Sequence, residues 1–261
     1  MTAPHTNNSR ATLQVDHDIA TITFTRDEKR NAFDTDMSET VSRFLDQSVA
    51  QSARVILLRA QPAASVWCAG HDLGEFRQGD DPCDLTSPLF RLVEKIQNVP
   101  APVIAVLEGD AYAGGVLLLM ASDLVVVTDS VKLVMTGNRI GVPFPTSIYR
   151  YWLHVFGLHR IKELFLTAQP MTAQQAYTAG IVNRVCHPDE LEPTLAELTA
   201  SILACSPEGV ADTKRQLNLL AAQSGLSEAE QESIDSARRQ IYESATFATR
   251  LATYRAGLGR S

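Results

Sequence analysis

The N-terminal part of the chain alternates apolar and polar residues before it changes to a helical pattern. In residues 11–25, ATLQVDHDIATITFT, the alternation is interrupted by the polar pair His17-Asp18. Period-two alternation on both sides of a polar break is typical of a β-hairpin. Beyond it, apolar residues recur at helical spacing after Asp34 and Thr35, residues of types that cap helices, so we predict a helix there. Its apolar positions are Met37, Val41, Phe44 and Leu45.

Three short apolar runs have the length of buried strands. They cover residues 54–60, 101–109 and 123–130. Residues 111–124, AYAGGVLLLMASDL, lie between the second and third runs and have the length of a helix. Strands that alternate with a helix in this way predict an α/β fold with buried sheets.

From about residue 147 the pattern becomes helical, with breaks at Gly157, Pro170 and Gly180. Further amphipathic helices are predicted at DELEPTLAELTASILAC, PEGVADTKRQLNLLAAQ and SEAEQESIDSARRQIYES. We therefore divide the chain into a core, residues 1–200, and a helical C-terminal region, residues 201–261.

Charge and cysteine content narrow the classes of function. The formal net charge is −7 and there is no basic block, which argues against a nucleic acid or a membrane as partner, although local cations can still hold a small anion. The polar N-terminus and the short apolar runs predict a cytoplasmic protein. The cysteines are scattered without a CxxC pair, so we expect reduced thiols and no metal site. They are Cys68, Cys83, Cys186 and Cys205.

Two glycine-containing turns each follow a predicted strand: residues 68–76, CAGHDLGEF, and residues 112–120, YAGGVLLLM. In each, we expect the backbone to enter a helix, whose first N–H groups lack partners and carry partial positive charge. Two such ends directed at one point would stabilise a carbonyl oxygen that becomes negative, and glycine lets a ligand approach closely. Either turn alone is explained better by tight packing; the two together, each after a strand, favour a site.

These segments resemble a known family. CAGHDLGEF followed by AVLEGDAYAGGVLLLMASDLVVV is similar to the crotonase, or enoyl-CoA hydratase/isomerase, superfamily. RDEKRNAFD and FLTAQPMTAQQAYTAGIVNRV are similar to further segments of that family, so the resemblance covers nearly the whole chain. It implies a spiral of ββα units whose C-terminal helices build homotrimers, often paired into hexamers. It also implies an acyl-CoA thioester as substrate, with coenzyme A as part of that substrate and no permanently bound cofactor.

The resemblance assigns candidate site residues. The thioester carbonyl would lie between the backbone N–H groups of His71 and Gly114. Lys29 would meet the coenzyme A phosphates or adenine region, or is simply a surface lysine. The other predicted coenzyme A contacts are Ala32, Ala69, Asp72 and Leu73. Asp72 and Asp123 also fit a structural role as caps of backbone donors. The family's C-terminal lysine falls at Gly257, where Arg255 or Arg260 is a possible replacement.

Two glutamates that activate water in the family's hydratases have no counterpart here. They would fall at Leu117 and Gly137, and neither residue transfers protons. General acid–base catalysis contributes about 10²–10⁴ in rate, so hydration through that pair is not expected. Decarboxylation of a malonyl-type thioester needs the oxyanion hole alone, because the departing carboxylate leaves its electron pair on the α-carbon.

Segments near residue 140 and in ARRQIYES are similar to the family's methylmalonyl-CoA decarboxylases, with departures. Those enzymes carry a glutamate where Leu117 stands and a carboxylate-orienting tyrosine where Phe144 stands, so Phe144 only shapes or dries the pocket. Thr136, Asn138 and Arg139 are nearby polar groups that either contact a carboxylate or belong to the turn and surface. The predicted catalytic residues are His71, Gly114, Leu117, Thr136 and Phe144.

Three hypotheses remain open at this point. The first is an acyl-CoA decarboxylase. The second is a hydratase or isomerase whose proton-transfer residue lies elsewhere, with Glu75 and the acids of residues 79–84 as candidates on a loop. The third is a non-catalytic acyl-CoA-binding scaffold, in which the apolar run simply packs.

Overall fold

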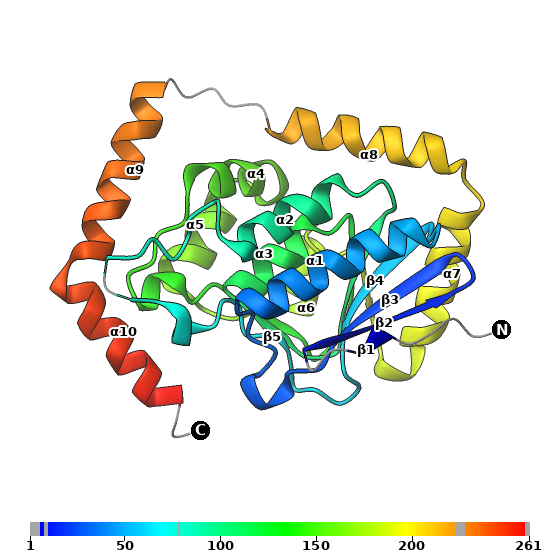
Figure 1. Ribbon diagram of the computed structural model, residues 1–261, viewed down its shortest axis with the longest axis horizontal. Helices are drawn as coiled ribbons and strands as arrows, with labels where there is room; N and C mark the ends of the chain where they lie inside the picture. Colours follow the sequence, from blue (N-terminus) through cyan, green and yellow to red (C-terminus); the bar gives the residue numbers. More distant parts are fainter. Residues whose placement is uncertain (1–5, 8–9, 78, 223–227, 259–261) are drawn as a thin grey trace.

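The chain folds around one sheet of seven strands and one of four (Figure 1). The computed structural model describes residues 6–7, 10–77, 79–222 and 228–258. The order of the larger sheet is β1-β2-β3-β4-β6-β8-β11; β1, β2 and β3 pair antiparallel and the other neighbours pair parallel. Its strands are β1 (Thr6–Asn7), β2 (Ala11–Asp16), β3 (Ile19–Phe24), β4 (Val55–Ala60), β6 (Val103–Leu107), β8 (Leu124–Thr128) and β11 (Arg184–Cys186).

The smaller sheet determines where the two glycine turns lie. Its order is β10-β9-β7-β5, with β5, β7 and β9 parallel and β10 antiparallel. Its strands are β5 (Val66–Cys68), β7 (Asp110–Tyr112), β9 (Lys132–Val134) and β10 (Met171–Thr172). Cys68 pairs with Ala111, so the segments that follow β5 and β7 leave the sheet side by side. Neighbouring parallel strands thus bring the two turns together.

Ten α-helices and four short 3₁₀ helices complete the described part of the chain. The α-helices are α1 (Thr35–Ala50), α2 (Pro88–Asn98), α3 (Gly114–Ala121), α4 (Thr146–Phe156), α5 (Leu158–Thr167), α6 (Ala173–Thr178), α7 (Leu191–Leu203), α8 (Pro207–Ala222), α9 (Glu228–Glu243) and α10 (Ala245–Leu258). The 3₁₀ helices are η1 (Asp27–Lys29), η2 (Leu73–Glu75), η3 (Gly137–Arg139) and η4 (Pro188–Glu190).

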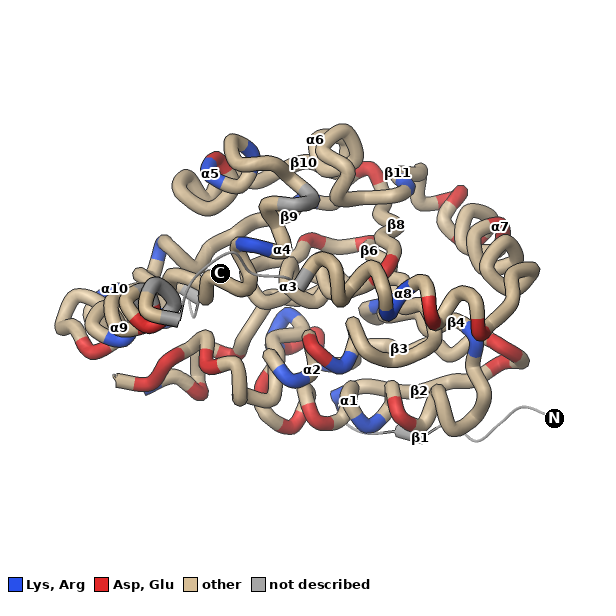
Figure 2. Tube along the Cα trace, turned by 90° about the horizontal axis from the view of Figure 1, so that it is seen from above, with Lys and Arg blue, Asp and Glu red and all other residues tan. Residues whose placement is uncertain are grey.

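Both faces of the larger sheet are covered, which explains why its parallel strands are continuous apolar runs. In β4, Ile56 and Leu58 face the main core with α1, α2 and α3, whereas Val55 and Leu57 face a second cluster under α7. Helix α3 is buried over its whole length. Figure 2 shows it in the middle of the molecule without a charged residue, with the charges of α1 and α2 on the outside.

The last three helices leave the sheet region. In Figure 1, α8 runs along one side of the molecule, and α9 and α10 form a bent pair at the end opposite the N-terminus. The pair is joined to the main core, because Tyr242, Phe247 and Leu251 belong to the same buried cluster as the sheet and α3. The division at residue 200 stays a sequence-based prediction; α7 ends at Leu203 and α8 begins at Pro207.

Most of the predicted elements are found in the structure. The hairpin is β2–β3, and α1 begins where predicted, with the Asp34 carboxylate accepting from the Met37 N–H at 2.9 Å. The three apolar runs are β4, β6 and β8, and residues 111–124 contain the expected helix, α3. The predicted breaks at Gly157 and Pro170 separate α4, α5 and α6 from one another, and Gly180 lies just after the end of α6.

The first glycine turn differs from the prediction. We expected it to enter a helix, but residues 73–75 form only the 3₁₀ turn η2, and His71 lies in extended backbone that pairs with Phe33. The N–H of Phe33 donates to the Gly70 carbonyl at 2.7 Å, and the N–H of Asp72 donates to the Phe33 carbonyl at 2.8 Å. This pairing holds the segment straight, so the His71 N–H belongs to extended backbone and not to the first turn of a helix.

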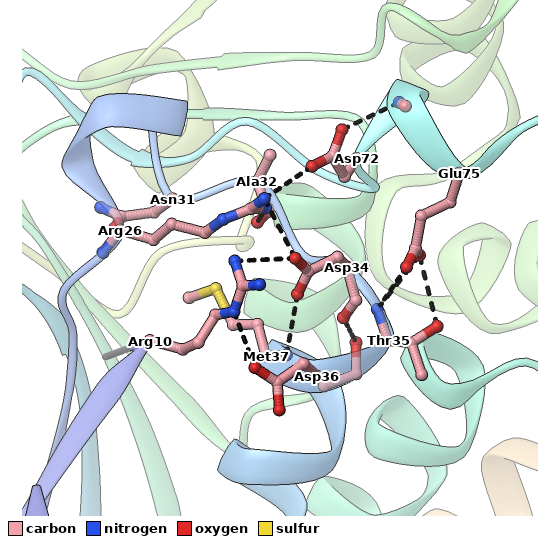
Figure 3. A network of polar contacts seen from close by, with 12 residues as sticks. Arg10, Arg26, Asn31, Ala32, Asp34, Thr35, Asp36, Met37, Asp72 and Glu75 are labelled. Carbon is pink, nitrogen blue, oxygen red and sulfur yellow. Dashed lines mark hydrogen bonds and ion pairs between the residues drawn. The ribbon is translucent and has the colours of Figure 1, made fainter. Parts of the chain in front are cut away.

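A buried arginine joins the beginning of α1 to the segment that follows β5. The Arg26 guanidinium lies 3.0 Å from the Asp34 carboxylate and 2.9 Å from the Asp72 carboxylate, and it donates to the Ala32 carbonyl at 2.6 Å (Figure 3). Its side chain is 8% exposed, so the two ion pairs are largely desolvated. Arg10 adds a second cation to Asp34, at 2.8 Å. Arg26, Asp34 and Asp72 are called the Arg26 cluster below.

The Arg26 cluster changes the acidity of Asp72. Burial raises the pKa of this carboxyl, but the Gly74 N–H and the Arg26 guanidinium outweigh burial, so the pKa lies below the ordinary value of 3.8. Asp72 is also the cap of η2, where it accepts from the Gly74 N–H at 2.8 Å. Asp72 therefore has the structural role that we considered for it, because it caps backbone donors.

A second buried ion pair attaches α8 to the core. The Lys214 ammonium lies 2.7 Å from the Asp123 carboxylate and donates to the carbonyls of Ile96 and Ala101. Asp123 in turn accepts from the Val103 N–H at 2.7 Å. Burial raises the pKa of Asp123 and lowers that of Lys214, the directions expected of charges taken out of water.

Replacing Lys214 should destabilise the fold strongly. Lys214→Met leaves the Asp123 carboxylate buried without its cation, which typically costs about 3–5 kcal/mol. Urea unfolding measures the loss, and exposed Lys162 on α5 provides the control Lys162→Met. The double variant Asp123→Asn/Lys214→Met should recover part of the stability. A Lys214→Met variant as stable as the control would contradict a structural role for the pair.

The Asp72 ion pair should make stability depend on pH at the acid end. A carboxyl with a lowered pKa stabilises the folded state above its unfolded pKa, and this contribution disappears as pH falls through the folded pKa. The wild type should therefore be more stable than Asp72→Asn at pH 6, and the difference should shrink as pH falls below about 4. Denaturant unfolding of both proteins between pH 3 and pH 6 measures this. A difference that stays constant over that range would show that the charge of Asp72 contributes nothing.

Candidate active site

A cavity of about 530 Å³ opens between the first glycine turn, α3, η3 and α10. All ten residues that the sequence assigned to catalysis or coenzyme A contact line it. They are Lys29, Ala32, Ala69, His71, Asp72, Leu73, Gly114, Leu117, Thr136 and Phe144. The structure thus brings residues from four separate segments to one place; their roles remain proposals.

The backbone nitrogens of His71 and Gly114 face one narrow gap. A Cβ on Gly114 would lie 3.0 Å from the His71 nitrogen, and a Cβ on Gly70 would lie 2.7 Å from the Gly114 nitrogen. Neither nitrogen is a donor in the hydrogen bonds of the described residues. Gly114 is the first residue of α3, where helix geometry leaves the N–H without an internal acceptor. The two nitrogens therefore lie close together, and neither N–H has an acceptor among the described residues.

The neighbouring residues Gly114 and Gly115 lack a side chain for different structural reasons. At Gly114 the absence of a side chain leaves the gap in front of the His71 nitrogen open. At Gly115 a Cβ would lie 2.5 Å from the Cys68 carbonyl oxygen, so glycine is required for α3 to pack against β5. Tight packing therefore explains Gly115, whereas a site at Gly114 stays a prediction.

Ala113 sets the direction of the Gly114 N–H at the expense of local strain. Its φ is 42° and its ψ is −107°, in a region that residues with a Cβ rarely adopt. The Ala113 N–H donates to the Val134 carbonyl of β9 at 2.9 Å, which holds the turn in this conformation. Backbone strain of this kind is concentrated at functional sites.

The imidazole of His71 is largely buried, between Phe76 and Glu75. It stands edge-on to Phe76, with 4.6 Å between ring centroids, and its Nε2 lies 3.6 Å from the Glu75 carboxylate. Its Nδ1 is buried without a hydrogen-bond partner. Burial lowers the pKa of His71 below 6.5 and outweighs the opposite effect of Glu75. Burial therefore disfavours the charged form of the side chain, and the part of His71 that borders the gap is its backbone nitrogen.

An apolar wall lies at and beside positions 117 and 137, where the resemblance would place the hydratase acids. Leu117 on α3 is 2% exposed, and Phe144 is 5% exposed. A Cβ on Gly137 would lie 2.8 Å from the Phe144 ring and 2.9 Å from the Val142 carbonyl oxygen. The Phe144 ring therefore takes the volume that a side chain at position 137 would need.

The polar residues near this wall have different positions. Thr136 lines the cavity, and its hydroxyl takes part in no hydrogen bond of the described residues. Asn138 and Arg139 do not line the cavity: the Asn138 amide donates to the Phe165 carbonyl at 2.8 Å, and the Arg139 guanidinium donates to the Ala168 carbonyl at 2.6 Å. Glu75 is bonded to the Thr35 N–H outside the cavity.

Cations gather among the residues that line the cavity. Lys29 and Arg30, on and next to η1, are exposed, and Arg255 comes from α10. Arg255 donates to the carbonyls of Leu73 and Phe76. Gly257 lines a separate depression between α10 and Arg139 of η3, and Arg260 lies outside the described residues.

Sequence reasoning missed several lining residues. Leu89 and Phe90 come from α2, Ile140 and Val142 follow η3, and Tyr254 comes from α10. The helical periodicity of α2 was a signal for the first two. Nothing local to α10 indicates that this helix folds back over η2 and η3, because that contact depends on the path of the chain between distant elements.

The described residues contain no cluster of histidine, cysteine or carboxylate side chains that could hold a metal ion. None of the four cysteines forms a disulfide bond, and burial raises the pKa of the Cys68 thiol to about 12. No helix that the structure describes is long and apolar enough to cross a bilayer.

Known proteins of the same fold act on coenzyme A thioesters. The sequence is 32% identical to the methylmalonyl-CoA decarboxylase of Escherichia coli strain K12 over 227 residues, 87% of each chain. The structure matches a methylmalonyl-CoA decarboxylase in complex with 2-nitronate-propionyl-CoA with a TM-score of 0.92 and 29% identity, over 95% of this chain and 96% of the other. It matches a methylmalonyl-CoA decarboxylase complexed with 2S-carboxypropyl CoA with a TM-score of 0.93 and 28% identity, over 97% of both chains.

These likenesses extend over nearly the whole chain, and they confirm the predicted crotonase fold. Residues 14–246 match the enoyl-CoA hydratase/isomerase family. The match covers the two glycine turns, the apolar wall and α9. The chain is therefore a crotonase-fold member of the enoyl-CoA hydratase/isomerase family.

Proposed function

We propose that the protein decarboxylates a malonyl-type coenzyme A thioester. The observation that carries the proposal is the pair of free N–H groups, His71 and Gly114, beside a wall in which Leu117 and Gly137 replace the hydratase acids. Two carboxylates line the cavity, and neither belongs to this wall: Glu28 is on the exposed turn η1, and Asp72 pairs with Arg26.

The reaction divides into two steps. The bond between the α-carbon and the carboxylate breaks, carbon dioxide leaves, and the electron pair forms an enolate whose negative charge lies on the thioester oxygen. The N–H groups of His71 and Gly114 hold that oxygen. The α-carbon then takes a proton from water, which leaves a shortened acyl-CoA. The first step needs oxyanion donors and no base, in agreement with the groups that are present.

The apolar wall favours the loss of the carboxylate. Burying a carboxylate without a paired cation is unfavourable. A carboxylate against Leu117 and Phe144 is therefore raised in free energy, whereas the enolate oxygen, to which its charge moves, has two donors. Thr136 supplies one hydroxyl at this wall and is proposed to orient the carboxylate.

The relatives support this assignment. The 32% identical relative is a methylmalonyl-CoA decarboxylase, and the matching structures hold 2-nitronate-propionyl-CoA and 2S-carboxypropyl CoA. We propose that Lys29, Arg30 and Arg255 meet the phosphates of the coenzyme A part, and that Ala32, Ala69 and Leu73 border it. Coenzyme A then enters as part of the substrate and not as a resident cofactor. The free thiols fit a reducing, cytoplasmic location.

Gly114→Ala should abolish most of the activity. The new methyl group would lie 3.0 Å from the His71 nitrogen, in the space proposed for the oxyanion. Losing one oxyanion donor typically costs about 10²–10³ in kcat. Mass spectrometry after incubation with methylmalonyl-CoA, malonyl-CoA and crotonyl-CoA measures turnover. The control is Gly209→Ala on α8, where a Cβ meets only ordinary contacts at 3.7 Å.

Each outcome of this panel has a meaning. Carbon dioxide loss in the wild type and the control, but not in Gly114→Ala, supports the proposal. Addition of water to crotonyl-CoA would point to a hydratase with an acid elsewhere. Unchanged thioesters together with measurable coenzyme A binding would favour the non-catalytic scaffold.

We also propose that the chain assembles through α8, as a trimer or a pair of trimers. Leu217, Leu219 and Leu220 are 61%, 57% and 62% exposed on α8, and Leu153 on the neighbouring α4 is 41% exposed. Leu217 and Leu220 are three residues apart and share one face of α8, and exposed apolar side chains that share a face are typical of an interface between proteins.

Replacing exposed leucines of α8 by charged residues should dissociate the proposed oligomer. Leu217→Glu/Leu220→Glu places carboxylates where a second copy would bury leucine, and should shift the wild-type oligomer to a smaller species in sedimentation velocity. Both side chains are exposed, so folding should be retained, as circular dichroism can verify. The control Gln216→Glu adds a charge to the same helix without removing an apolar side chain. An unchanged sedimentation profile in the double variant would rule out this patch as the interface.

A further inference from the structure

We propose that Tyr242 and Arg255, on the helix pair α9–α10, are positioning residues that join the two walls of the cavity. One wall follows β5 and carries the His71 N–H; the other follows η3 and carries Phe144. The effect on turnover rests on the decarboxylation proposed above, whereas the effect on the mobility of the walls does not.

Tyr242 contacts both walls. Its side chain is 1% exposed, and its hydroxyl donates to the Pro143 carbonyl at 2.5 Å, one residue before Phe144. Its own carbonyl accepts from the N–H of Gly79 at 3.4 Å, in the loop that continues the first wall. One residue of α9 thus connects two segments that are more than sixty positions apart in the sequence.

Arg255 fixes the first wall from α10. Its guanidinium donates to the carbonyls of Leu73 and Phe76, at the two ends of the short turn η2. This turn begins two residues after His71, and Phe76 packs against the His71 ring. The position of the His71 N–H therefore depends on α10 as well as on the Arg26 cluster.

Buried apolar side chains anchor the helix pair to the main core and thereby hold Tyr242 and Arg255 in place. Phe247 and Leu251 are 1% and 3% exposed, and the Phe247 ring lies 5.7 Å from the Tyr242 ring. A Cβ on Gly141 would lie 3.9 Å from both Phe247 and Arg250, so the end of η3 packs directly on α10. The Arg250 guanidinium also lies 3.5 Å from the Arg139 carbonyl.

The consequence for catalysis is a fixed distance between the oxyanion donors and the apolar wall. An enolate oxygen held at His71 and Gly114 fixes the substrate at one end. The carboxylate must then meet Phe144 and Thr136 at the other end. A small change in the position of a reacting group is costly in rate, so loosening either wall should lower kcat more than substrate affinity.

Tyr242→Phe tests the contact, because it keeps the buried ring and removes only the hydroxyl. We expect kcat for the decarboxylated thioester to fall about tenfold, the rate equivalent of one hydrogen bond, with unchanged affinity for coenzyme A in calorimetry. In hydrogen–deuterium exchange, the amides of residues 137–146 should exchange faster. Arg255→Lys keeps the charge but loses the two-carbonyl contact, and should speed exchange at residues 71–77.

Tyr177→Phe is the matched control, because Tyr177 is 49% exposed on α6 and does not line the cavity. Wild-type kcat together with wild-type exchange in both segments of the variants would overturn the proposal, even if their unfolding midpoints fall. If the wild type decarboxylates none of the thioesters, the proposed function fails, and the exchange measurement alone then decides the proposal on Tyr242 and Arg255.

Discussion

The arrangement of the site depends on one buried cation between two carboxylates. Arg26 holds Asp34, at the beginning of α1, and Asp72, beside His71, at 3.0 Å and 2.9 Å. Removing one partner of a desolvated ion pair is far more costly than the net gain from forming it. The cluster therefore acts as a constraint on geometry: the first wall of the cavity cannot move away from α1 without leaving a charge buried and unpaired. The position of the His71 N–H in the gap depends on this constraint.

The second donor is held by different means. Gly114 owes its direction to the positive φ of Ala113 and to the pairing of β7 with β9, and its proximity to His71 to the pairing of β7 with β5. One donor is thus oriented by charge and the other by backbone geometry. Because both groups are peptide N–H groups, they remain protonated throughout the pH range in which the side chains titrate, so the proposed contact with the oxyanion needs no particular protonation state of His71.

The sequence indicated the parts of the site whose signal is local. Strand, glycine turn and helix are readable around Gly114, and so is the absence of acids at Leu117 and Gly137. The extended backbone at His71 was not readable, because it depends on pairing with Phe33, nearly forty residues earlier. The contacts of Tyr242 and Arg255 join residues 99 and 182 positions apart, and no periodicity within α9 or α10 encodes such a distance. Contacts between residues far apart in the sequence therefore account for most of the site features that the sequence did not predict.

The close fit between Gly137 and Phe144 restricts how this protein could change its chemistry. Any side chain at position 137 meets the ring of Phe144 and also the Val142 carbonyl, which belongs to the backbone and is not removed by substitution. A carboxylate introduced there alone would break the packing before it could handle a proton. A mutational route toward a hydratase through this position thus requires that residue 137 and its neighbours, Phe144 above all, change together. Because one substitution depends on another in this way, the type of reaction is hard to change by single substitutions, even when selection favours a different substrate.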